Sequence, residues 1–208
     1  MENLIPNQEF SQLASPDQVE RTVQALEARG IHTLVVETGE EARDCALSML
    51  PPGAEVYNPP SQTMDQIGLT AKIETATSFV PVRARLRSMD KATQQREIRQ
   101  ITASPDVVIG SVHAITVDGE VLIASFTGSQ LSSIVFGAGR VIWVAGIQKL
   151  VHNLDEGYRR IREYSYPLEN LRTQRVYGQT SSINKILLIS GEFPGRISLI
   201  LVRQNLGF

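Results

Sequence analysis

Four short polar segments of this chain contain residue types that bind anions. Each combines small residues, which let a ligand approach the backbone, with a hydroxyl, amide or ammonium group. They are residues 37–39 (Glu-Thr-Gly), 127–130 (Thr-Gly-Ser-Gln), 146–149 (Gly-Ile-Gln-Lys) and 178–185 (Gly-Gln-Thr-Ser-Ser-Ile-Asn-Lys). In a parallel sheet, ligands collect at the carboxyl ends of the strands, where helix N-termini offer free N–H groups. Together the segments predict a polar cleft for an anion or a carboxylate-bearing metabolite.

Lys149 is the most informative residue of these segments for predicting an anion site. It is one of four lysines beside 16 arginines, and it follows an apolar strand, where partial desolvation would favour anion binding or a lowered pKa. We expect it to be mostly exposed; a surface lysine without a binding role is the alternative. The predicted ligand-binding residues are Thr127, Gly128, Ser129, Gln130, Gly146, Lys149, Ser181 and Ser182. The small residues also suit ordinary helix caps, so a purely structural interpretation of each stays open.

Three weak catalytic candidates stand out, and the sequence alone assigns no reaction to them. Glu37, at the end of a predicted strand, could be a nucleophile or base, or could cap a helix. His113, inside a predicted strand, could be a general base or a hydrogen-bonded structural residue. Asp118 belongs to an Asp-Gly turn. The chain contains no Walker A or GxGxxG motif, so the usual nucleotide signatures are missing.

Cysteine and histidine are too few for an expected metal centre. Cys45 is the single cysteine, so it cannot form an internal disulfide or a cysteine-based cluster. The three histidines have no metal-ligand spacing. We therefore predict no metal and no cofactor. Cys45 shares a helical face with Ala42 and Met49, which predicts a buried, unreactive thiol.

The composition is that of a globular protein. The chain has 208 residues, 42% of them hydrophobic, with a net charge of −2 and a pI near 6.0, which argues against a nucleic-acid binder. The sequence has no signal peptide and no apolar run long enough to span a membrane, so we expect a cytoplasmic protein without membrane contact. We expect residues 1–14 to be a weakly structured leader and residues 15–208 to form one domain.

Strands and helices alternate along most of the chain. Helices are predicted over 15–30, 40–50, from 63, over 82–102, from 128, over 154–164 and over 168–177; strands are predicted over 31–37, 54–57, 107–116, 120–125, 140–145, 185–190 and 197–203. An antiparallel hairpin is predicted at Asp118-Gly119. The arginine-rich helix 82–102 has either a solvated face or an anion-facing one. The pattern predicts a three-layer α/β/α fold with a mostly parallel sheet and a local antiparallel hairpin.

Several of these segments, in this order, resemble the LUD family, the lactate-utilisation proteins of the C type, formerly a domain of unknown function. The resemblance lies in residues 110–119, 125–130, 137–140, 146–149, 166–170, 181–185 and 194–196. It implies a NagB/RpiA/CoA-transferase-like fold and a role in oxidising L-lactate to pyruvate beside iron–sulfur partner subunits. Many relatives have an acidic residue where this chain has Val117, so Asp118 or Glu120 would have to supply that carboxylate.

Two functions follow from the resemblance. The first is an accessory or non-redox subunit of an organic-acid (L-lactate) oxidising system that binds a small anionic metabolite. The second is a stand-alone enzyme of the CoA-transferase-like class acting on an acyl, phosphosugar or folate-type substrate, which rests on fold analogy. A homo-oligomer is compatible with either function.

Overall fold

The computed structural model describes residues 4–208 and is built on a six-stranded sheet in which every strand pair is parallel. Strand β7 lies at the centre because it is the longest buried apolar run, and its neighbours are apolar in turn. The strand order is β1 (His32–Val36), β10 (Ile197–Val202), β7 (Arg140–Gly146), β4 (Val107–Gly110), β2 (Glu55–Tyr57) and β3 (Val80–Pro81).

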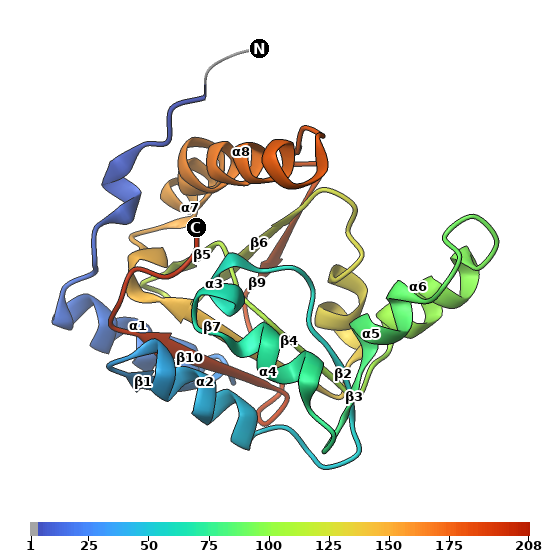
Figure 1. The fold of residues 1–208 in the computed structure, drawn as a ribbon. Helices are drawn as coiled ribbons and strands as arrows, with labels where there is room; N and C mark the ends of the chain where they lie inside the picture. Colours follow the sequence, from blue (N-terminus) through green and yellow to red (C-terminus); the bar gives the residue numbers. More distant parts are fainter. Residues whose placement is uncertain (1–3) are drawn as a thin grey trace.

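The two faces of this sheet pack into two separate cores. Side chains alternate along β7, so Ile142 and Val144 face one core while Val141 and Trp143 face the other. The Ile142 face is covered by α2 (Gly39–Ser48), α3 (Gln62–Gln66) and α4 (Leu69–Thr75), seen at the lower centre of Figure 1. Ala42, Ala46 and Met64 supply the small or flexible side chains that let these helices approach closely.

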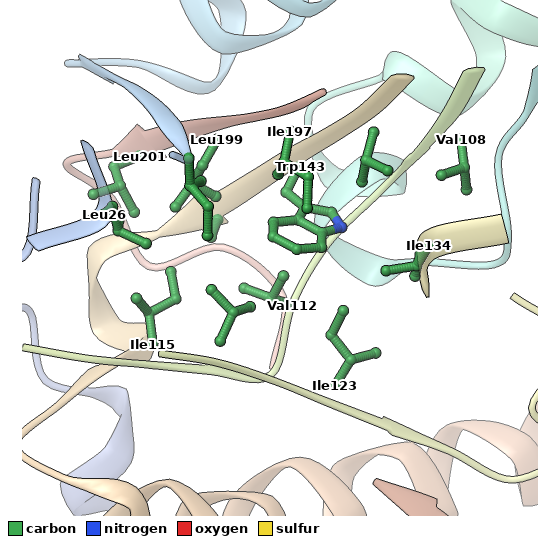
Figure 2. Packing of buried hydrophobic residues seen from close by; sticks show 14 of the residues in the cluster. Leu26, Val108, Val112, Ile115, Ile123, Ile134, Trp143, Ile197, Leu199 and Leu201 are labelled. Atoms are coloured by element: carbon green, nitrogen blue, oxygen red, sulfur yellow. The ribbon is translucent and has the colours of Figure 1, made fainter. Parts of the chain in front are cut away.

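The Trp143 face is covered partly by α1 (Pro16–Ala28) and partly by a second, four-stranded sheet. Figure 2 shows the Trp143 indole between Ile197 of the large sheet and Val112 and Ile123 from the small-sheet side. The small sheet has the order β8 (Leu150–Val151), β5 (Ala114–Thr116), β6 (Val121–Ser125) and β9 (Lys185–Ile189), with β6 antiparallel to both of its neighbours.

Two neighbouring crossovers connect the sheets. Residues 111–113 lead from β4 into β5, and the 3₁₀ turn η3 (Ile147–Lys149) leads from β7 into β8. The strands at each end of these crossovers are paired, because β4 is parallel to β7 and β5 is parallel to β8. The far side of the small sheet is covered by a continuous helical run of α7 (Leu154–Arg160), the π-helical η4 (Ile161–Ser165) and α8 (Tyr166–Tyr177), at the top of Figure 1.

The structure confirms the expected α/β fold with a mostly parallel sheet and a local hairpin, and it corrects two elements. The strand expected over 107–116 is two strands, β4 and β5, which belong to different sheets. The helix expected over 82–102 is interrupted: α5 (Val82–Arg87) and α6 (Gln95–Ala103) flank a turn in which Asp90 accepts hydrogen bonds from the Ala92 N–H and the Thr93 hydroxyl. An aspartate that bonds nearby backbone competes with helix formation.

The start of the chain is partly packed onto this body. Within residues 4–14, η1 (Gln8–Ser11) is a 3₁₀ turn, Phe10 is buried, and the Asn7 N–H donates to the Glu163 carbonyl at 2.8 Å. The first three residues of the expected leader lie outside the described part. Cys45 is half-buried rather than fully buried, and burial raises the pKa of its thiol. Within residues 4–208, no helix is both long and apolar enough to cross a membrane.

Candidate functional site

Lys149 is buried at the carboxyl edge of the large sheet, with 1% of its surface exposed. Its Nζ lies 3.0 Å from Thr63 Oγ1, 3.0 Å from Ser111 Oγ and 3.1 Å from the Val112 carbonyl oxygen. The expectation of a mostly exposed lysine is therefore wrong, because α3 and the crossover after β4 close over the end of β7. Burial, and then the nearby Arg160 guanidinium, hold the pKa of Lys149 well below its usual range.

Arg160, the last residue of α7, is fully buried beneath the same crossovers. It donates to the carbonyl of His113, to the Gln148 carbonyl at 3.3 Å and to Ser165 Oγ at 3.1 Å. Its Nη2 is buried without a partner among the described residues. Burial lowers the pKa of Arg160 to about 10, so it stays charged at neutral pH.

No carboxylate in residues 4–208 forms an ion pair with Lys149 or Arg160. A buried charge normally has a paired counter-charge. The positive potential of this part of the molecule is therefore uncompensated by the protein, which favours an anionic ligand or a negative charge that develops during a reaction.

His113 is held as a neutral imidazole near Lys149 and Arg160. Its Nδ1 accepts a hydrogen bond from the Ala124 N–H at 3.1 Å, so the ring proton is on Nε2. Burial, followed by the charges of Lys149 and Arg160, lowers the pKa of His113 to about 3. At neutral pH the ring can donate through Nε2.

A first prediction follows for His113. Because its pKa lies near 3, its imidazole signals should show the Nε2–H tautomer and should not shift between pH 5 and pH 8. Nitrogen-15 NMR of the imidazole rings, with His113→Gln used to assign the signals, measures this. A titration of His113 centred near pH 6.5 would contradict the arrangement.

A cavity of about 350 Å³ opens beside this cluster, large enough for a small metabolite. Its acidic lining residue, Glu169, is held in a two-point ion pair by Arg172 at 2.7 Å and is therefore neutralised. Hydroxyl groups dominate the rest of the polar lining; they belong to Ser61, Thr63, Ser111, Ser125, Thr127, Ser129, Ser165, Thr173, Thr180, Ser181 and Ser182, with Tyr166 and Tyr177.

Six of the eight predicted ligand-binding residues line this one cavity: Thr127, Ser129, Gln130, Lys149, Ser181 and Ser182. Gly128 lies behind them, against the Lys185 side chain. Gly146 does not line the cavity, because the chain near the carboxyl end crosses it so closely that a Cβ there would lie 2.3 Å from the Gln204 carbonyl oxygen.

These predicted residues lie together, but not because the strands before them end at one edge of a single parallel sheet. The strands before Gly128 and Gly146 would end at one edge only in a single parallel sheet, but β6 belongs to the small sheet and β7 to the large one. The segments meet because the small sheet packs across the face of the large sheet. A helical segment does follow Gly128: it begins at Leu131 and continues as the π-helical η2 (Ser133–Gly137).

Two of the weak catalytic candidates lie away from the cavity. Glu37 pairs with Arg203 at 3.1 Å, and its side chain is 71% exposed. Asp118 pairs with Arg21 of α1 at 2.7 Å. His113 does line the cavity. Glu120 accepts a hydrogen bond from the Thr116 hydroxyl at 2.9 Å, outside the cavity lining, and Val117 is buried.

Three residues of the site were missed from the sequence: Thr63, Ser111 and Arg160. Ser111 could have been found, since it follows a buried strand in the same way as the segments that were chosen. Arg160 also had a signal, because it shares a helical face with Gly157, Ile161 and Tyr164, where an arginine is out of place unless its donors are satisfied.

A basic groove adjoins the cavity. We define it by the four cations that line it, Arg83, Arg87, Lys91 and Arg99, which α5, α6 and the turn between them supply. It shares Pro60, Ser129 and Tyr177 with the cavity, so the two are continuous. Arg83 and Arg87 share Glu74, at 3.3 and 2.8 Å, and no acidic residue of the described chain lines the groove.

Comparison with known proteins agrees with this architecture. The model of the family described as LUD domain matches residues 19–202. The structure is similar to the crystal structure of a DUF162 family protein from Deinococcus radiodurans, with a TM-score of 0.55 and 12% sequence identity over 92% of this chain and 99% of that one. That likeness concerns the fold alone. No curated protein matches the sequence.

Proposed function

Because the chain belongs to the LUD domain family, we propose that it binds a small anionic metabolite in the cavity beside Lys149 and that the ligand extends toward the basic groove. One observation carries the proposal: four cations line the groove, while the acidic residue that lines the cavity, Glu169, is already neutralised by Arg172. The many hydroxyl groups of the lining suit the oxygen atoms of a carboxylate, a phosphate or a hydroxy acid.

The role that fits the family is an accessory or non-redox subunit in organic-acid utilisation, with L-lactate as the proposed acid, iron–sulfur subunits as the proposed partners and the cytoplasm as the proposed compartment. The sequence contains a single cysteine, so redox chemistry in this role would need a partner subunit or a bound cofactor. A stand-alone enzyme acting on an acyl, phosphosugar or folate-type substrate is the second candidate. The contact between Ser111 and Lys149 favours it.

The binding proposal is tested by charge removal. We expect Arg99→Gln and Lys91→Gln each to weaken the binding of pyrophosphate by roughly tenfold to a hundredfold, because a charge-assisted contact contributes about 1.5–3 kcal/mol. The matched control is Arg85→Gln, because Arg85 lies on α5 but pairs with Glu55 instead of lining the groove.

Isothermal titration calorimetry of the wild type and the three variants measures these affinities, with thermal melts to check folding. Equal affinities for the wild type, Arg99→Gln and Lys91→Gln, for every anion tested, would contradict the proposal. Mass spectrometry of small molecules that co-purify with the native protein identifies the ligand class and separates the two candidate roles.

A further inference from the structure

The three oxygen atoms around Lys149 Nζ match the three N–H bonds of an ammonium, and they also fit a neutral amine to which the Ser111 hydroxyl donates. The Thr63 hydroxyl donates its proton to the Leu206 carbonyl at 3.2 Å, so it can only accept from Lys149. The Val112 carbonyl oxygen is also an acceptor. These two groups take both N–H bonds of a neutral amine and leave its lone pair. The remaining neighbour of that lone pair is Ser111 Oγ, at 3.0 Å; the other acceptor near the Ser111 hydroxyl, the Val112 carbonyl oxygen, lies farther away, at 3.5 Å.

We propose that Ser111 is a nucleophile for acyl transfer and that the Lys149 amine accepts its proton. A serine whose hydroxyl donates to a neutral lysine is one of the recurring ways to activate a nucleophile. Ser111 lines the cavity and is partly exposed there, whereas Lys149 is buried behind it. An incoming acyl group therefore meets the oxygen first and the base only through it.

The surrounding charges favour this state of the pair. The titratable groups of the elements packed around Lys149 are Arg160 of α7 and His113 of the crossover after β4; Glu169 and Arg172 of α8, which line the cavity, cancel each other. Arg160 is a permanent cation, so it disfavours a second charge on Lys149. His113 is neutral, so it does not offset the repulsion between Arg160 and a charged Lys149.

The reaction balances as follows. Ser111 Oγ attacks the carbonyl carbon of an ester or thioester while its proton moves to Lys149 Nζ. The tetrahedral oxyanion forms beside the Lys149 ammonium. The bond to the leaving alcohol or thiol then breaks, and Lys149 returns the proton to the leaving group. The acyl-Ser111 product is released by water or by a second acceptor that attacks the same carbon, again with Lys149 as the base.

A small alkyl fluorophosphonate tests the pair directly, because it reports serine activation without a known substrate. Ser111 Oγ forms a bond to phosphorus and fluoride leaves. We expect a single adduct on Ser111 in peptide mass spectra, no adduct in Ser111→Ala, and labelling about 100-fold slower in Lys149→Met. Ser48→Ala, an exposed serine of α2, is the matched control and should be labelled at the wild-type rate.

If Lys149→Met does not fold, the pH dependence of the wild-type labelling rate still tests the proposal. In the wild type the labelling rate should rise with pH as Lys149 loses its proton, with a midpoint well below that of an ordinary lysine. An unlabelled Ser111, or a labelling rate in Lys149→Met equal to that of the wild type, would overturn the proposal.

This inference goes beyond the proposed function, and the two fail separately. Labelling of Ser111 in a protein that binds none of the tested anions would refute the binding proposal and support the serine–lysine pair. Anion binding without labelling of Ser111 would do the reverse.

Discussion

Arg160→Ala should lower the free energy of unfolding by about 3–5 kcal/mol. The substitution leaves the His113 and Gln148 carbonyls without their donor in a buried place, and it opens a void under the small sheet. The neighbouring Arg159→Ala is the control, since Arg159 is more than half exposed and pairs with Glu163 on the surface of α7. It should cost about 1 kcal/mol or less.

Urea unfolding followed by tryptophan fluorescence measures both values, because Trp143 is buried between the sheets. Arg160→Met separates the two causes, since methionine fills much of the space but donates no hydrogen bond. It should recover only part of the loss. An Arg160→Ala protein as stable as Arg159→Ala would show that the carbonyls find other donors.

Gly30→Ala should be strongly destabilising, because the added methyl group meets both a backbone clash and a left-handed φ. Gly30 follows α1 with a φ of +80°, and a Cβ there would lie 2.0 Å from the Glu192 carbonyl oxygen. The segment before β10 lies directly over it, fixed by the hydrogen bond from the Glu192 N–H to the Arg29 carbonyl at 2.8 Å. The backbone must move to remove this clash, so we expect the free energy of unfolding to fall by about 4 kcal/mol or more.

Gly53→Ala is the matched control, because Gly53 has nearly the same φ, +77°, with nothing within 4 Å of the added Cβ. It should cost only the left-handed backbone strain, about 1–2 kcal/mol. Thermal and urea unfolding of the two variants side by side isolate the clash from the strain. Equal losses would mean that the segment carrying Glu192 moves away at little cost.

Features with a local cause could be predicted from the sequence. Ser15 accepts from the Gln18 N–H as the capping pattern indicates, and the Asp118-Gly119 pair closes the β5–β6 hairpin. Both depend on residues within a few positions of one another. The split of the strand expected over 107–116 has no such local signal, because both halves are apolar and buried, and only the choice of pairing partners separates them.

The environment of Lys149 could not be predicted from the sequence either, because it also depends on residues far away in the chain. Its neighbours in sequence, Gln148 and Leu150, say only that it follows a strand. The groups that bury it, Thr63 and Ser111, are 86 and 38 positions away. Sequence therefore located the lysine at the right edge of the sheet, whereas its exposure and protonation depend on how the second sheet is placed.

The proposed pair lies on two of the connections between the sheets, so it depends on how the sheets move relative to each other. Ser111 lies on the crossover from β4 to β5 and Lys149 on that from β7 to β8, and the strands at both ends are paired. The two crossovers therefore run side by side between the same two pairs of strands. No ladder of hydrogen bonds joins the two sheets in residues 4–208, so a small sliding of one sheet over the other would leave the strand pairing of both intact. Because the two connections lie side by side, such a motion would carry Ser111 and Lys149 together.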